Sequence, residues 1–237
     1  MKVLSIIHQR DAGAGVFAEA LLDAGAELDE WLVSEGGDPP ADPLSYDAAM
    51  IFGGAMHVDQ EDRHRWLNPE KRLLRELLER GRPLLGACLG AQLLCAAAGG
   101  QVRRMARPVI GWLEVEVTDE GRQDPLLGPL APRFTAFQRH SYECVPPPHA
   151  PVLARSQECA QAFKLGERAW ALQFHAEVSV ADAGAWIDDW RADEDAVRIG
   201  LDAEALRAET ERAIGAWNEL GRELAARWLE AVAAPAR

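Results

Sequence analysis

Short apolar runs alternate with helical patterns along the first hundred residues. Strand-like runs cover residues 3–7, 27–33, 47–52 and 82–86, and helical spacing of apolar residues occupies 16–22, 69–80 and 89–98. Strands that alternate with helices are typical of right-handed β-α-β crossovers. Such crossovers place helices on both faces of a parallel sheet. The pattern therefore predicts an α/β fold for this half of the chain.

The second half of the chain has a different texture. Apolar and polar residues alternate over 112–117, 133–137, 160–164 and 169–174, which is typical of antiparallel strands. From Val180 the chain is helical, and one apolar stripe runs along 201–232. We therefore expect a three-layer α/β sandwich with a central, mostly parallel sheet, an antiparallel extension and C-terminal helices. Residues 1–190 form the predicted domain, and 191–237 form a helical extension that packs on it or on a partner.

Charge and cysteine content exclude several classes of partner. The 237 residues carry a formal net charge of −13, which repels nucleic-acid phosphates and anionic lipids. No apolar run approaches the ~20 residues that span a bilayer. We expect neither a nucleic-acid nor a membrane partner. The four cysteines contain no CxxC pair, which favours a cytoplasmic protein without a disulfide framework.

The most informative segment is LLGACLGAQ at residues 84–92. An apolar strand ends, Cys88 is flanked by glycines two places to either side, and a helix begins. This is the pattern of a nucleophile elbow with cysteine as the nucleophile. Free N–H groups and the positive end of the helix dipole favour a thiolate at Cys88, and the amide of Leu89 would supply one oxyanion donor. The alternative is a buried core cysteine, which needs no glycine bracket.

A cysteine nucleophile needs a base, and the segment ALQFHAE at 171–177 offers one. His175 and Glu177 are two residues apart, so on extended chain their side chains share a face. Glu177 can then orient the imidazole of His175, which acts as general base and acid. Taken without the elbow, the same two residues would be interpreted as a surface pair.

Paired glycines follow the predicted strand at 47–52. Glycine at 53 and 54 lets backbone N–H groups turn toward a ligand, so the amide near Gly54 is the predicted second oxyanion donor. A plain turn after a strand is the alternative. The glycine pair, the elbow and the His-x-Glu segment all lie at carboxyl ends of strands, where open α/β sheets place their sites.

The segments GACLGAQ at 86–92 and QFHAE at 173–177 together resemble the class I (triad) glutamine amidotransferases, over roughly residues 1–190. The resemblance implies a flavodoxin-like fold and a Cys-His-Glu triad that attacks the carboxamide of glutamine, forms a glutamyl thioester, releases ammonia and hydrolyses the thioester. It also implies substrate-binding residues, namely Gly53, Gln92, His140 and Ser141. Two positions depart from the family pattern: Ala55 replaces a common proline, and Tyr142 replaces an aspartate.

The predicted function is thus cysteine-dependent hydrolysis of a γ-glutamyl amide. One alternative is a γ-glutamyl peptidase that acts on γ-glutamyl peptides, and another is a non-catalytic binding or regulatory module on the same fold. We expect a small-molecule substrate, and a synthetase or acceptor subunit in trans and a homodimer both stay open. We expect no cofactor and no metal, because a charged loop, rather than a metal site, is the simpler interpretation of His57, Asp59, Asp62 and His64.

Overall fold

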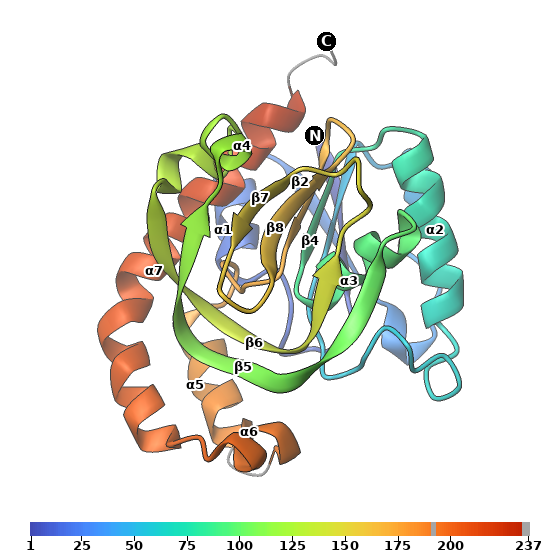
Figure 1. Cartoon of the computed structure of the whole chain (residues 1–237). Helices are drawn as coiled ribbons and strands as arrows, with labels where there is room; N and C mark the ends of the chain where they lie inside the picture. Colours follow the sequence, from blue (N-terminus) through green and yellow to red (C-terminus); the bar gives the residue numbers. More distant parts are fainter. Residues whose placement is uncertain (191–192, 234–237) are drawn as a thin grey trace.

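The computed structural model describes residues 1–190 and 193–233, and within them nine strands form one sheet (Figure 1). The order across the sheet is β2-β1-β3-β4-β9-β8-β7-β5-β6. The strands are β1 (Lys2–Ile7), β2 (Glu27–Leu32), β3 (Ala48–Ile51), β4 (Leu84–Ala87), β5 (Gln101–Val117), β6 (Arg133–Val145), β7 (Val152–Arg155), β8 (Ala160–Leu165) and β9 (Ala169–Leu172). The helices are α1 (Gly15–Asp23), α2 (Leu67–Glu79), α3 (Leu89–Ala97), α4 (Asp119–Arg122), α5 (Val180–Trp190), α6 (Glu194–Ile199) and α7 (Ala203–Ala233).

The sheet has a parallel part and an antiparallel part. Strands β2, β1, β3, β4 and β9 pair in parallel, with Leu4 opposite Ala49 and Leu85 opposite Trp170. Strands β8, β7, β5 and β6 continue the same sheet in antiparallel pairing. The predicted α/β sheet with an antiparallel extension is confirmed, and the extension is large enough to supply as many strand pairings as the parallel part.

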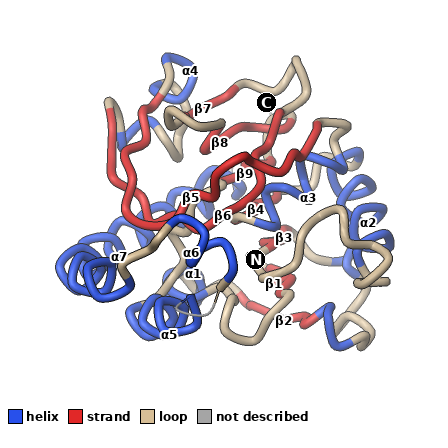
Figure 2. The backbone as a smooth tube through the Cα atoms, turned by 60° about the horizontal axis from the view of Figure 1, so that its bottom comes forward, coloured by secondary structure: helices blue, strands red, loops and turns tan. Residues whose placement is uncertain are grey.

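Helices cover both faces of the parallel strands, so a hydrophobic core lies on each side of the sheet (Figure 2). The core on one face joins α1, α5 and α7 around Phe17, Ile187 and Trp228. The core on the other face joins α2 and α3 around Leu74 and Leu93. Strands β3, β4 and β9 are buried along their whole length, because both faces are covered, and this explains their near-continuous apolar sequences.

The antiparallel part differs in detail from the sequence prediction. Strand β5 begins at Gln101 and β6 ends at Val145, both well beyond the segments that the alternating pattern marks. Residues 101–107 of β5 are exposed or half-buried, so no apolar face distinguishes them. The sequence pattern does not predict strand β7, because its four residues are too few to carry a recognisable alternation.

Helix α7 lies against the same face as α1 and α5 (Figure 1). The indole Nε1 of Trp217 donates a hydrogen bond of 2.8 Å to the carbonyl of His175, and Asn218 Nδ2 donates one of 2.7 Å to the carbonyl of Val178. The C-terminal helix therefore contacts the segment that follows β9. The predicted extension starts at residue 191 and ends at 237, and 191–192 and 234–237 lie outside the described residues.

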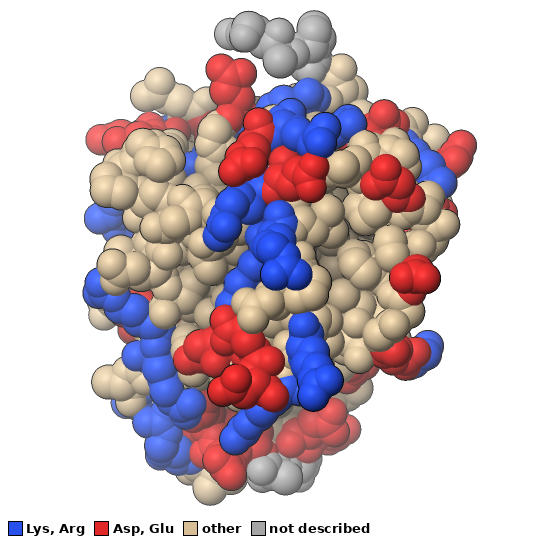
Figure 3. Space-filling view, turned by 90° about the vertical axis from the view of Figure 1, so that its right-hand side faces the viewer, with Lys and Arg blue, Asp and Glu red and all other residues tan. Residues whose placement is uncertain are grey.

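Charged side chains of both signs lie side by side on the face that is at the right of Figure 1 (Figure 3). Arg80 and Glu76 form one of the ion pairs of α2, with 2.7 Å between nitrogen and oxygen. Within the described residues, no helix is both long enough and apolar enough to cross a membrane.

Candidate active site

Cys88 lies in the sharp turn between β4 and α3. Its backbone has φ 50° and ψ −107°, a conformation that costs a non-glycine residue about 1–3 kcal/mol. The turn closes because glycine stands on either side. A Cβ at Gly90 would lie 2.0 Å from the carbonyl oxygen of Ile51, and one at Gly86 would lie 2.7 Å from the backbone of Gly90. The strained turn thus presents one sulfur at the carboxyl edge of the sheet.

His175 and Glu177 follow the end of β9 and face each other. The imidazole Nδ1 lies 2.7 Å from Glu177 Oε1, and both side chains are buried. The backbone of His175 is held from two sides, since its N–H donates to Phe137 and its carbonyl accepts from Trp217. The ring therefore has a fixed position and a fixed carboxylate partner.

The imidazole of His175 also hydrogen-bonds the side chain of Cys88. Burial on its own lowers the pKa of this imidazole, but the negative charges of Glu177 and Cys88 outweigh burial and raise the pKa to about 10. At neutral pH His175 is therefore an imidazolium, and its charge stabilises a thiolate at Cys88. On its other side the sulfur lies 3.5 Å from the carbonyl oxygen of Arg139.

The glycine pair after β3 lies next to these two side chains. A Cβ at Gly53 would lie 3.2 Å from Cε1 of His175 and 3.8 Å from Cβ of Cys88. Gly54 lines the same pocket as Cys88, and a Cβ at Gly54 would lie 3.5 Å from a side-chain methyl of Leu89. The two segments predicted to supply oxyanion donors thus come together beside the sulfur.

Cys88 and His175 open into a pocket of about 270 Å³. Its walls come from four parts of the chain: the loop after β1, the glycine loop, β6, and α5 with the residues that follow it. Besides Gly54, Cys88 and His175, the lining residues are Gln9, Asp11, Ala12, Ala55, Arg139, Trp186, Asp189, Trp190 and Asp193. Sequence reasoning gave Gln9 only as a rim residue and did not single out Arg139 or the α5 residues, although a tryptophan and aspartate repeat along 182–193 could have drawn attention to them.

Three residues that the resemblance assigns to substrate do not line this pocket. Gln92 Nε2 donates to Gln173 Oε1 over 3.4 Å. The Nδ1 of His140 donates to the carbonyl of Tyr142 over 3.0 Å, and burial lowers the pKa of His140 to about 4, so the ring is neutral. Ser141 donates to the carboxylate of Asp195. Their role in substrate binding stays a prediction, and all three lie in β6 or α3 behind the pocket wall.

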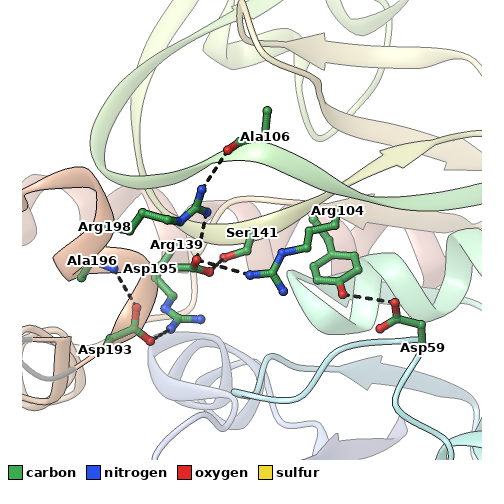
Figure 4. Close-up of polar contacts among 10 residues, drawn as sticks. Asp59, Arg104, Ala106, Arg139, Ser141, Asp193, Asp195, Ala196 and Arg198 are labelled. Carbon is green, nitrogen blue, oxygen red and sulfur yellow. Dashed lines mark hydrogen bonds and ion pairs between the residues drawn. The ribbon is translucent and has the colours of Figure 1, made fainter.

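A polar network ties the start of α6 to the long strands β5 and β6 (Figure 4). Arg139 forms an ion pair with Asp193, whose other oxygen caps α6 by accepting from the amide of Ala196 at 2.9 Å. Asp195 accepts from Ser141 and from Arg198, the latter over 3.0 Å. Burial raises the pKa of Asp195, but these donors and nearby Arg104 lower it below its usual value. The network thereby fixes Arg139 and Asp193 in the pocket wall.

The charged loop after the glycine pair makes ordinary side-chain contacts. His57 stacks on the ring of Tyr142 with 4.5 Å between centroids, and the Tyr142 hydroxyl donates to Asp59 over 3.1 Å. Among the described residues, no group of three or more His, Cys, Asp or Glu side chains has the geometry to hold a metal ion.

A cysteine at a strand-to-helix elbow, beside a buried histidine and carboxylate at the carboxyl edge of an α/β sheet, is typical of α/β enzymes with a thiol nucleophile. Comparison with known proteins gives the family. The sequence model of the glutamine amidotransferase class-I family matches residues 16–189, and the chain belongs to this family.

Individual relatives agree with this assignment. A subunit of the glutamine-hydrolyzing GMP synthase of Ignicoccus hospitalis is 32% identical over 152 residues, which are 63% of this chain and 76% of the relative. The glutamine amidotransferase-like protein YfeJ of Salmonella typhimurium is 26% identical over 184 residues, covering 76% of this chain and 77% of the relative. The crystal structure of a glutamine amidotransferase from Thermotoga maritima superimposes with a TM-score of 0.86 at 26% identity, covering 97% of this chain and 98% of that chain.

Proposed function

We propose that this chain hydrolyses a γ-glutamyl amide through a glutamyl thioester and releases ammonia or an amine. Cys88 is the nucleophile, His175 the proton carrier and Glu177 its orienting partner. The observation that carries the proposal is the contact between the protonated imidazole of His175 and the sulfur of Cys88 in an accessible pocket.

In the first step the Cys88 thiolate attacks the amide carbon, and a carbon–sulfur bond forms. The carbonyl oxygen becomes an oxyanion, which accepts hydrogen bonds from the amides near Gly54 and Leu89. The carbon–nitrogen bond then breaks, and the leaving nitrogen takes the proton of His175. Because His175 starts as an imidazolium, its first task is that of a general acid.

In the second step neutral His175 removes a proton from water. The hydroxide so formed attacks the thioester carbon, the carbon–sulfur bond breaks, and the Cys88 thiolate is restored beside a protonated His175. Glutamate leaves, and the protons balance over the two steps. Throughout, Glu177 keeps the imidazole in one orientation and stabilises its positive charge.

Glutamine is the first candidate substrate, and a γ-glutamyl peptide is the second. A specific observation favours the second candidate: Arg139 lines the pocket, and its Nε is buried without a hydrogen-bond partner among the described residues. A carboxylate on the leaving group of a γ-glutamyl peptide would accept from this nitrogen. Glutamine has no group on its leaving nitrogen that could do so.

A substrate panel tests both candidates. Release of glutamate is measured from glutamine and from γ-glutamyl dipeptides, for the parent chain, Cys88→Ala and the matched control Cys159→Ala. We expect Cys88→Ala to abolish release and Cys159→Ala to leave it unchanged, because Cys159 lies outside the pocket. Equal rates for the parent and Cys88→Ala would refute the proposal. Arg139→Gln separates the substrates: it should raise KM for the dipeptides and leave glutamine unaffected if Arg139 binds the leaving group.

The acceptor of the ammonia is water or a second chain in trans. One relative is by name part of a GMP synthase with more than one kind of chain, which favours a partner chain. The turnover of the isolated chain distinguishes the two cases. A kcat on the order of 1 s⁻¹ or above would support hydrolysis by the chain alone, and a rate far below this value would support a partner that activates the site.

A further inference from the structure

A second histidine and carboxylate pair lies directly behind the glycine loop. His8 follows β1, Glu70 lies in the first turns of α2, and both side chains are buried. The Nε2 of His8 lies 2.9 Å and 3.1 Å from the two carboxylate oxygens of Glu70. The ring of Trp66 stacks on the imidazole, with 5.0 Å between centroids. No step of the proposed hydrolysis uses this pair.

The other nitrogen of His8 faces the backbone of the glycine loop. Nδ1 lies 3.0 Å from the carbonyl oxygen of Phe52 and 3.2 Å from that of Gly53. Every partner of the ring is therefore an acceptor, so both nitrogens must carry hydrogen. Burial lowers the pKa of His8, but Glu70 and the two carbonyl groups raise it by more, which agrees with an imidazolium. His8 thus donates to Glu70 on one side and to the glycine loop on the other.

This contact fixes the direction of the peptide group between Gly53 and Gly54. In a trans peptide the C=O and the following N–H point in opposite directions. Since the carbonyl of Gly53 points at His8, the N–H of Gly54 points away from His8. Gly54 lines the pocket beside Cys88, and Gly53 is in contact with Cε1 of His175, so the side away from His8 is the side of the reacting groups.

The neighbouring residue holds the next peptide group. Gln9 Oε1 accepts a hydrogen bond of 2.8 Å from the amide of Ala55. Proline, which is common at this position in the family that the sequence resembles, has no N–H and could not make this bond. In this chain two consecutive residues at the end of β1 therefore hold the loop that a proline ring would otherwise stiffen.

We propose that the buried His8–Glu70 pair positions the Gly54 amide as an oxyanion donor, with Gln9 holding the following peptide. The proposal rests on the proposed function, because an oxyanion forms only when Cys88 attacks a carbonyl group. His8 is a positioning residue, since it acts through the backbone of Gly53. A hydrogen bond from a cation to the Gly53 carbonyl also polarises that peptide group, which strengthens its N–H as a donor.

The test compares two reactions of the same sulfur. Acylation of Cys88 by 4-nitrophenyl acetate forms a carbon–sulfur bond, expels 4-nitrophenolate and passes through an oxyanion. Alkylation by iodoacetamide forms a carbon–sulfur bond and expels iodide without an oxyanion. Both rates are followed at Cys88 by peptide mass spectrometry. A loss confined to acylation reports the oxyanion donors, whereas a distorted or unfolded site slows both reactions.

His8→Phe alone would leave the Glu70 carboxylate buried and unpaired, so the main variant is the double change His8→Phe with Glu70→Met, which replaces the pair by apolar groups. We expect its acylation rate to fall at least roughly 30-fold, somewhat less than the loss of a whole oxyanion donor, and its alkylation rate to stay within about threefold of the parent. In Glu70→Gln the neutral His8 ring keeps an N–H at Nδ1, so most of the acylation rate should be retained.

The control is Tyr46→Phe, which removes a hydrogen bond of 2.7 Å to Asp29 ahead of β3, at the opposite end from the glycine loop. Both of its rates should match the parent. Equal losses in acylation and alkylation, or no loss, in the double variant would overturn the proposal, and so would a parent Cys88 that is alkylated but never acylated. A selective loss in a chain that cleaves no γ-glutamyl compound would refute the proposed function and leave the role of His8 intact.

Discussion

Replacing Glu177 by glutamine tests the electrostatic core of the site. Glutamine has nearly the shape of glutamate, so the hydrogen bond of 2.7 Å to His175 Nδ1 can persist while the negative charge is lost. The other oxygen, Oε2, is buried and has no hydrogen-bond partner among the described residues. No cation in the described structure neutralises this carboxylate apart from the imidazole, so its charge acts mainly on His175.

The size of the effect follows from a comparison within the molecule. His175 has a pKa of about 10, whereas His140, which is similarly buried but has no carboxylate partner, has a pKa of about 4. Without the charge of Glu177, we expect the pKa of His175 to lie at or below the usual 6.5 of histidine. At pH 8 the protonated fraction would then fall from nearly complete to roughly 3%, about a 30-fold loss of the acid form.

Two measurements check this prediction. An NMR titration of the His175 imidazole gives its pKa directly, and the rate of thioester formation between pH 6 and 10.5 should lose its alkaline plateau in Glu177→Gln. Because folding raises the pKa of His175, protonation stabilises the folded parent fully below pH about 6.5, and this contribution is lost as the pH rises through about 10. Asp124→Asn, which removes a buried carboxylate near the start of β9, should leave the titration unchanged. If His175 in Glu177→Gln still titrates near pH 10, the reasoning is wrong.

Three further changes have defined outcomes. Gly90→Ala would put a Cβ 2.0 Å from the carbonyl oxygen of Ile51, so we expect a loss of more than about 3 kcal/mol in unfolding free energy, measured by urea titration. Gly215→Ala in α7 meets nothing within 4 Å and should stabilise the chain by up to about 1 kcal/mol, and a Gly90→Ala protein as stable as this control would contradict the packing argument. Trp217→Phe removes the bond to the His175 carbonyl and should cost about 1–2 kcal/mol, whereas an unchanged urea midpoint would mean that the carbonyl finds another donor.

The parallel half of the fold could be predicted from the sequence because burial on both faces leaves a direct mark. Strands β3, β4 and β9 read as short apolar runs, and each lies within two or three residues of its predicted position. The antiparallel half carries a weaker mark. In β6, Gln138 and His140 are buried although polar, because they hydrogen-bond within the fold, and an apolar–polar alternation cannot represent such positions.

The candidate site divides in the same way. Cys88, His175 and Glu177 could be proposed from the sequence because each lies in a short local pattern whose residue types the chemistry requires. Arg139 and Trp186 could not, since they reach the pocket only through the pairing of β6 and the packing of α5. A wall built from distant segments leaves no local pattern, and an arginine next to a histidine in a strand is equally typical of an exposed edge.

The two halves of the sheet also hold different parts of the proposed chemistry. The parallel strands present Cys88 and the glycine loop, whereas the backbone of His175 is fixed by Phe137 of the antiparallel strand β6 and by Trp217 of α7. The imidazole therefore reaches the sulfur only when the extension and the C-terminal helix are docked on the parallel core. Since an unpaired buried carbonyl is costly, loss of α7 would release the segment that carries His175 while leaving the elbow at Cys88 in place. It follows that the separation of nucleophile and proton carrier between two docked parts makes catalysis more sensitive to packing of α7 than the fold itself is.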